Sequence, residues 1–154
     1  MTMTNEVSSA KVEMLIRKPV DEVFEAFVDP TITTKFWFTK SSGRLEEGKR
    51  IRWDWEMYGA SAELEVKQLN QNEQIVILFE DDTTVEWIFT SRTEGTLVSI
   101  TNKGFKGSPT EIVNQVIDAT GGYTIVLCGL KALLEHNIIL NLVSDRFPDA
   151  NVKH

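Results

Sequence analysis

The sequence is poor in the side chains that most often carry catalysis or cross-links. Its 154 residues include one cysteine, Cys128, and two histidines, His136 and His154. A single cysteine cannot form an internal disulfide, and two such histidines cannot build a compact multi-histidine metal site or an obvious nucleophile-activating pair. We therefore expect no metal, no cofactor and no catalytic residues. Cys128 lies in an apolar run and is interpreted as a buried, inert thiol.

Positive charge and long apolar runs are also scarce. Sixteen Lys and Arg against 23 Asp and Glu give a formal net charge of −7, which argues against nucleic acid as a partner. No uninterrupted apolar run approaches the roughly 20 residues that span a bilayer, and no basic segment with an apolar run opens the chain. We expect no membrane span and a cytoplasmic location, with which the lone cysteine is compatible.

The apolar residues are numerous enough for one well-packed domain. The composition is 42% hydrophobic and 25% charged, which is typical of a globular domain with a sizeable core. We predict a flexible leader over residues 1–9, which are mostly polar, and a single domain over residues 10–154.

The first part of that domain predicts a strand followed by two short helices. "KVEMLI" (residues 11–16) alternates apolar and polar side chains, as a half-buried strand does. "PVDEVFEAFVDP" (residues 19–30) has apolar residues at helical spacing and acids near its N-terminal end, where they favour the helix dipole. Asp29 before Pro30 is typical of a cap on a second short helix.

An antiparallel meander should follow, because several alternating runs are separated by turn residues such as Tyr58-Gly59 and Glu94-Gly95. In "IRWDWEM" (residues 51–57) the alternation places Trp53 and Trp55 together on one face and the charges on the other. The five predicted strands are Ile51–Met57, Ala60–Leu69, Gln74–Glu80, Thr83–Thr90 and Thr96–Asn102.

The spacing then becomes helical and predicts a long helix over about residues 110–137. Apolar residues form two stripes that cover more than half of its circumference, so we expect a curved sheet to wrap it. Gly121 and Gly122 should each cost about 1 kcal/mol relative to Ala, and we interpret the pair as a bend over a cavity beside Tyr123. The alternative is that the helix starts after the glycines. The tail, residues 138–154, continues the helix or folds back as a docked arm.

This order of elements resembles the START-like (SRPBCC) superfamily, an α+β class with the helix-grip (START/Bet v-like) fold. "KPVDEVFEAFVDPTITTKFWF" is similar to the opening signature of bacterial homologues of the heat shock protein 90 ATPase activator C-terminal domain. "GGYTIVLCGLKALLEH" is similar to their terminal-helix signature, in which the position of Tyr123 is commonly Trp. The resemblance covers roughly residues 10–137.

The resemblance implies a cavity between the curved sheet and the long helix, in which relatives hold hydrophobic small molecules. The inner faces predicted above supply aromatic walls for it, although aromatics on an inner face often serve packing alone. The candidate ligand-binding residues are Trp37, Phe38, Trp53, Trp55, Phe79, Trp87, Phe89, Tyr123 and Leu127.

Three functions remain open at this point. The first is noncatalytic binding of a hydrophobic or aromatic small molecule. The second, implied by the family, is a co-chaperone-like module that docks a protein partner through its acidic surface or the apolar tail. The third is a cyclase- or hydratase-type enzyme, for which Tyr123 or Asp118 would have to act as acid or base. The apolar tail is compatible with a monomer or a homodimer.

Overall fold

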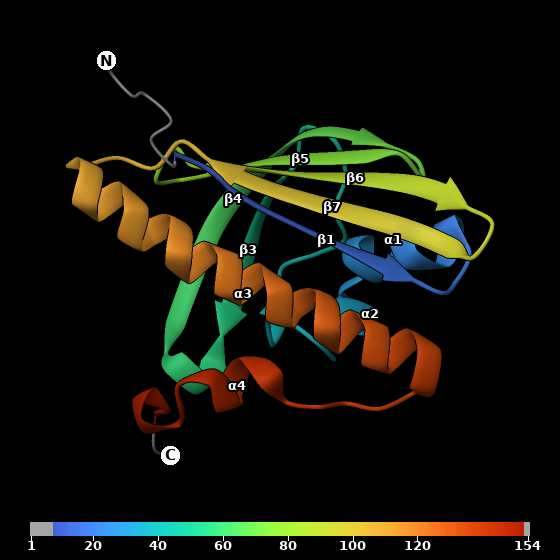
Figure 1. Ribbon diagram of the computed structural model, residues 1–154. Helices are drawn as coiled ribbons and strands as arrows, with labels where there is room; N and C mark the ends of the chain where they lie inside the picture. The colour runs from blue at the N-terminus through green and yellow to red at the C-terminus, as the bar shows by residue number, and fades with distance from the viewer. Residues whose placement is uncertain (1–7, 153–154) are drawn as a thin grey trace.

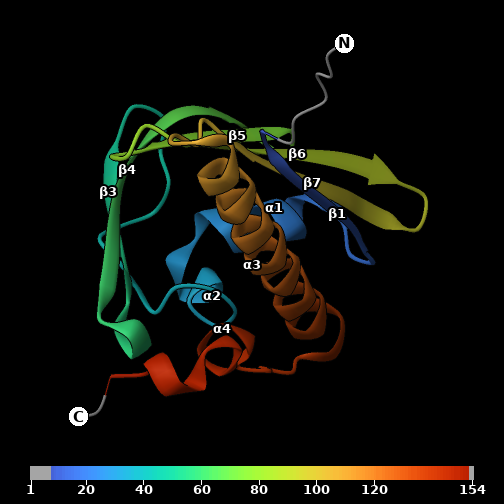
Figure 2. The same ribbon diagram turned by 60° about the vertical axis from the view of Figure 1, so that its left-hand side comes forward.

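A seven-stranded antiparallel sheet curves around one long helix in the computed structural model, which describes residues 8–152. Figure 2 shows β3 and β4 turning down from the rest of the sheet, with α3 running along the concave side. The predicted α+β helix-grip fold is confirmed. The leader predicted over residues 1–9 falls almost wholly outside the described residues.

The predicted elements occur in the predicted order, and the structure adds a two-residue strand before the meander and short helical turns in the tail (Figure 1). The strands lie side by side in the order β1-β7-β6-β5-β4-β3-β2, so the five predicted meander strands are neighbours in the sheet. The strands are β1 Ala10–Ile16, β2 Lys40–Ser41, β3 Arg50–Trp55, β4 Ala60–Asn70, β5 Gln74–Phe79, β6 Thr84–Arg92 and β7 Gly95–Lys103. The helices are α1 Val20–Val28, α2 Pro30–Thr33, α3 Pro109–His136 and α4 Leu142–Arg146, with 3-10 turns at Glu56–Tyr58 and Pro148–Ala150.

The two short helices form as their capping residues predict. The Asp29 carboxylate accepts a hydrogen bond from the Thr31 amide at 3.0 Å, and Pro30 occupies the first position of α2, where its missing N–H costs nothing. The Thr33 hydroxyl donates to the Ala26 carbonyl at 2.6 Å and joins α2 to α1. This pair fills one end of the sheet's concave face.

The strand that carries the two tryptophans is shorter than predicted. β3 ends at Trp55 and the chain enters a 3-10 turn, so the prediction that Met57 continues the strand is wrong. Gly59 ends this turn with a φ of 62°, a left-handed conformation that glycine adopts without steric cost. The chain then reverses into β4.

Helix α3 is continuous through both glycines, so the alternative start after Gly122 is wrong. At its first turn the Ser108 side chain accepts from the Glu111 amide and Glu111 accepts from the Ser108 amide, a capping box. Asn137 ends the helix in a left-handed conformation. The tail then folds back as a docked arm that carries α4 (Figure 1).

The predicted burial of α3 is correct only for its C-terminal part. One of the two predicted apolar stripes consists of Val113, Ile117, Val126 and Leu133. Val126 and Leu133 are buried, but Val113 and Ile117 are exposed, Ile117 to 64%. The sheet does not wrap the first turns of the helix. By length and composition α3 could span a membrane, but burial in the core accounts for the apolar side chains of its C-terminal part.

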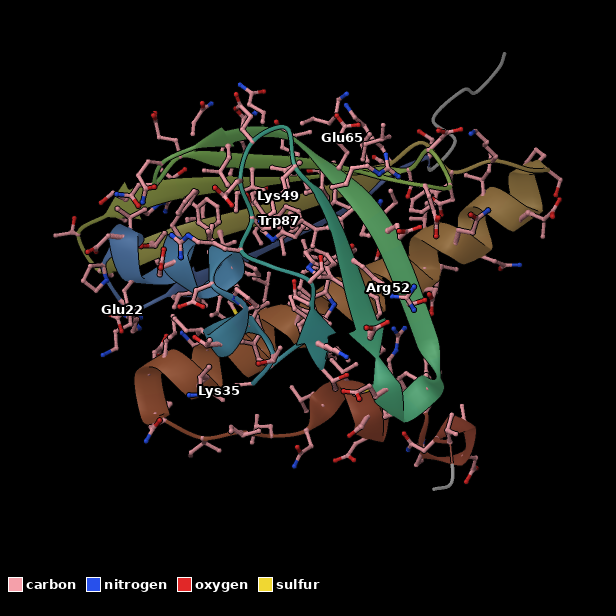
Figure 3. All side chains as sticks on the ribbon, turned by 180° about the vertical axis from the view of Figure 1, so that it is seen from behind. Glu22, Lys35, Lys49, Arg52, Glu65 and Trp87 are labelled. Atoms are coloured by element: carbon pink, nitrogen blue, oxygen red, sulfur yellow. The ribbon has the colours of Figure 1, made fainter. Side chains whose placement is uncertain are left out.

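The core is an aromatic cluster between the sheet and α1. Phe38 stacks on Trp53 with ring centroids 4.5 Å apart, and Phe27 packs against Trp87 and Phe89 at 5.8 and 5.9 Å. Figure 3 shows Trp87 inside the fold, while Arg52 and Glu65 lie on the outside of the sheet. The alternation along the strands therefore separates core from surface as predicted.

Candidate functional site

A pocket of about 500 Å³ lies between the concave face of the sheet, the middle of α3 and the folded-back C-terminal segment. Its volume is within the range of about 300–1,000 Å³ that small-molecule sites occupy. Its wall is mostly apolar, and aromatic rings contribute much of it. The aromatic lining residues are Trp37, Trp55, Tyr58, Phe79, Phe105, Tyr123 and Phe147.

The two tryptophans of β3 have different surroundings although both face inward. Trp53 is 1% exposed and stacks on Phe38 in the core. Trp55 is partly exposed and lines the pocket. Their rings are 6.4 Å apart and nearly perpendicular. The strand alternation therefore fixes which face the rings share, but the position along the strand decides whether a ring packs or lines the pocket.

Trp37 joins the core to the pocket. Its ring lies 4.9 Å from Trp53 on the core side and 5.7 Å from Tyr123 on the pocket side. Trp87 lies 5.9 Å from Trp37 but does not reach the pocket wall. Four candidate residues line the pocket, namely Trp37, Trp55, Phe79 and Tyr123. The other five, Phe38, Trp53, Trp87, Phe89 and Leu127, lie in the core behind the wall.

Three polar residues at one end of the pocket, Asp81, Thr83 and Asn102, were not among the predicted residues. Asp81 and Thr83 come from the β5–β6 turn, and Asn102 comes from the end of β7. Turn residues of this kind are common on protein surfaces, so their types alone gave no signal. Only the pairing of β6 with β7, which places Val85 opposite Asn102, brings that turn beside the end of β7.

The C-terminal segment closes one side of the pocket. The Tyr58 hydroxyl donates to the Val143 carbonyl and accepts from the Phe147 amide at 3.3 Å. Farther along, the Val152 amide donates to the Met57 carbonyl at 2.7 Å. The turn after β3 therefore holds the returning tail, and Val143, Arg146 and Phe147 of that tail become pocket wall.

Arg146 lies directly against the glycine pair of α3. Its guanidinium donates to the Asp118 carbonyl at 3.0 Å and pairs with the Asp118 carboxylate at 3.2 Å. A Cβ atom added at Gly121 or Gly122 would lie 2.8 or 3.0 Å from a guanidinium nitrogen. Arg146 therefore approaches the helix most closely at the glycine pair, and a side chain at either position would displace its guanidinium.

Tyr123 and Asp118, the two candidate acid or base residues, both line the pocket. Burial, with the added negative charge of Asp81, raises the pKa of Tyr123 well above its usual value, so its hydroxyl stays protonated near neutral pH. Asp118 is ion-paired and its side chain is 70% exposed. Among residues 8–152, no group of three or more His, Cys, Asp or Glu side chains could hold a metal ion.

The fold and the position of the pocket define a START-like domain, with a cavity between sheet and terminal helix. Similar solved structures have the same architecture. A Staphylococcus saprophyticus protein is 32% identical, with a TM-score of 0.77 over 86% of this chain and 95% of that one. The Aha1 dimer from Colwellia psychrerythraea is 15% identical, with a TM-score of 0.74 over 84% and 98%. DynU16, from the dynemicin biosynthetic locus, is 21% identical, with a TM-score of 0.74 over 86% and 49%.

Residues 17–135 match the family described as "Activator of Hsp90 ATPase homolog 1-like protein". The chain belongs to this family, which confirms the resemblance found in the two sequence signatures. No curated protein matches the chain significantly by sequence.

Proposed function

We propose that this protein binds a hydrophobic or aromatic small molecule in the pocket between sheet and α3, without converting it chemically. The observation that supports this most directly is the 500 Å³ pocket itself, with Trp37, Trp55, Phe79 and Tyr123 in its wall. A cavity of this size with an apolar wall and a few polar groups is typical of a ligand site.

The polar residues of the pocket support binding over an enzyme of the cyclase or hydratase type. A general base should have a pKa near the operating pH, but the pKa of Tyr123 is raised far above it. Asp118, the other candidate, is held by Arg146. His136 does not line the pocket, and His154 lies outside the described residues. The protonated Tyr123 hydroxyl is suited to donating a hydrogen bond to a ligand.

A co-chaperone-like role is the second candidate, because the family takes its description from an activator of the Hsp90 ATPase. The segment that would contact a partner is the apolar stretch after α3. Ile138, Ile139 and Leu140 are 49%, 52% and 44% exposed, which is unusual for three consecutive large apolar residues.

The indole N–H signals of the four tryptophans test ligand binding, because Trp37 and Trp55 line the pocket and Trp53 and Trp87 lie in the core behind it. Nitrogen-15 correlation spectra would be recorded during titration with flavonoids, fatty acids, isoprenoids and aromatic polyketides. We expect one class to shift Trp37 and Trp55 saturably and Trp53, which is 1% exposed, much less. Such a ligand should also raise the melting temperature by mass action.

Two outcomes of the titration would contradict ligand binding in the pocket. If no compound moves Trp37 or Trp55, ligand binding in this pocket is wrong, and a search for partners of the 138–140 stretch becomes the better course. If all four indoles shift equally, the compound perturbs the whole fold and does not occupy the pocket.

A further inference from the structure

The wall of the pocket contains more negatively than positively charged side chains. Its wall contains two carboxylates, Asp81 and Asp118, and one guanidinium, Arg146. Arg146 already pairs with Asp118 at 3.2 Å. No Lys, Arg or His within residues 8–152 forms an ion pair with Asp81. The pocket therefore has one uncompensated negative charge, at the β5–β6 turn.

Asp81 also has an unused hydrogen-bond acceptor. Its Oδ1 accepts from the Thr83 amide at 2.9 Å and from the Thr83 hydroxyl at 2.7 Å, so the carboxylate is held in place by the turn. No donor in the described part of the chain reaches its Oδ2. Asp81 and Tyr123 of α3 line the same pocket, and the charge of Asp81 adds to the effect of burial in raising the pKa of Tyr123.

Asn102 adds a second acceptor at the same end. Its Nδ2 donates to the Thr84 carbonyl at 2.9 Å, which fixes the orientation of the amide. No donor among residues 8–152 reaches its Oδ1. Two fixed acceptors therefore lie at one end of the pocket, where water or a ligand supplies the donors.

The aromatic wall favours a positive charge as well. The faces of Trp, Tyr and Phe rings attract cations through their quadrupoles, by roughly 0.5–2 kcal/mol depending on exposure. Trp37, Trp55, Phe79 and Tyr123 line the same space as Asp81. The whole chain has a formal net charge of −7, which favours the approach of cations and disfavours that of anions.

We propose that the pocket selects an aromatic ligand that carries a protonated amine, with the aromatic body against Trp37 and Trp55 and the ammonium directed to Asp81 and Asn102. This inference rests on the proposed function, because it names the ligand class of the same pocket. A carboxylate placed at the same end of the pocket would meet the two acceptors of Asp81 and Asn102, and the guanidinium in the wall is already paired with Asp118.

Three probes that share one ring system test the selection. They are 2-naphthylmethylamine, 2-naphthalenemethanol and 2-naphthoate, titrated separately at pH 7 while the indole signals of Trp37 and Trp55 are followed. We expect the amine to bind about tenfold tighter than the carboxylate, with the alcohol between them, as for a partly exposed charge contact. The difference should shrink at high salt, since Asp81 is solvent-exposed.

Comparison of Asp81→Asn with the matched control Asp82→Asn measures the effect of the negative charge inside the pocket. Each removes one negative charge from the same turn, and the amide introduced by D81N keeps an oxygen that can accept from Thr83. Asp82 lies outside the pocket wall, where it pairs with Lys106 at 3.0 Å, and Asn tolerates its left-handed backbone (φ 69°). D81N should reduce the amine-to-carboxylate ratio severalfold, and D82N should leave it unchanged.

The outcomes separate this inference from the function on which it rests. Equal affinities of amine and carboxylate, or equal effects of D81N and D82N, overturn the ligand class while binding in the pocket stands. If none of the three probes and none of the wider panel shifts Trp37 or Trp55, the proposed function itself fails.

Discussion

The two halves of α3 both carry apolar stripes but have very different surroundings. From Val126 to Leu133 the helix contributes five buried residues to the core, whereas from Pro109 to Ile125 only Val116 is buried. The first half instead supplies pocket wall, including Ala119 and Tyr123, and exposes Ile117 to solvent. One helix therefore serves as a core element at one end and as a side of a cavity at the other.

This difference follows from what lies opposite each half. The C-terminal half faces the aromatic core, and a Cβ atom added at its Gly129 would lie 3.2 Å from the Phe36 Cβ. The N-terminal half faces the pocket, so its side chains line the cavity and lie beside the end of the Arg146 side chain. Apolar composition alone does not show whether a residue packs or lines a cavity.

The largest effect on the free energy of unfolding is expected in the C-terminal half of α3, which packs in the core. Leu130 is fully buried, so Leu130→Ala should lower the free energy of unfolding by about 2–5 kcal/mol. Ile117→Ala, on the exposed half of the same helix, should change it by no more than about 0.5 kcal/mol. Urea denaturation of both variants measures the contrast, and similar losses would contradict the division of α3.

The next largest effect on stability concerns the end of the core half, where Glu135 joins α3 to the segment just after β1. Its carboxylate accepts from the Arg17 amide at 2.8 Å and from Lys131 at 2.7 Å. Burial opposes ionisation, but these hydrogen bonds and the nearby positive charge outweigh it and lower the pKa of Glu135. Glu135→Gln should cost about 1–3 kcal/mol at pH 7, because the amide replaces a charged acceptor.

The pH dependence of this contact has a defined sign. A lowered folded-state pKa means that the stabilisation is fully present above the unfolded value, about 4.3 for Glu, and is lost as the pH falls through the folded value. The stability difference between wild type and E135Q should therefore shrink below about pH 5. The exposed Glu22→Gln serves as the control; a difference for E135Q that persists to low pH would rule out the ionised contact.

A smaller effect is expected where the tail meets the pocket. The Tyr58 hydroxyl contacts Val143 and Phe147 of the tail, so Tyr58→Phe should cost about 1 kcal/mol and speed amide exchange over residues 143–152. Tyr123→Phe removes the only other tyrosine hydroxyl, which has no protein partner in the described part of the chain. Y123F should leave that exchange unchanged; slower or equal exchange in Y58F would contradict the anchoring role.

The smallest net change should come from the glycines. Gly121→Ala and Gly122→Ala each gain up to about 1 kcal/mol of helix propensity, offset in part because Arg146 must move away. Gly129→Ala gains the same propensity but places a Cβ 3.2 Å from the Phe36 Cβ and 3.4 Å from its carbonyl oxygen. Thermal unfolding should therefore show stabilisation or no change at 121 and 122 and destabilisation at 129.

Local patterns predicted nearly all of the fold. Alternation located β4 to β7 to within two residues, and Asp29-Pro30 correctly marked the start of α2. The errors occurred where an apolar pattern in the sequence extends beyond the part of the element that the core covers. Met57 keeps the alternation of β3 but lies in a turn, and Val113 and Ile117 keep the apolar stripe of α3 beyond the part that the core covers.

The site was less predictable for a related reason. Trp37, Trp55, Phe79 and Tyr123 reach the pocket, and alternation indicated only that the strand residues among them face inward. The depth of Trp53 depends on its stacking with Phe38, a contact between distant segments. The arm that brings Arg146 to the pocket depends on Tyr58, 88 positions earlier in the chain.

The C-terminal arm has a consequence for how this domain can diversify. None of the residues in α4 or in the 3-10 turn after it is buried, yet Val143, Arg146 and Phe147 face the pocket. Substitutions at Arg146 and Phe147 alter what the cavity accepts at little cost in folding, because neither side chain packs against the core, whereas Val143 does. Sequence changes in this short arm are therefore a route by which related proteins acquire different ligand preferences while the fold stays the same.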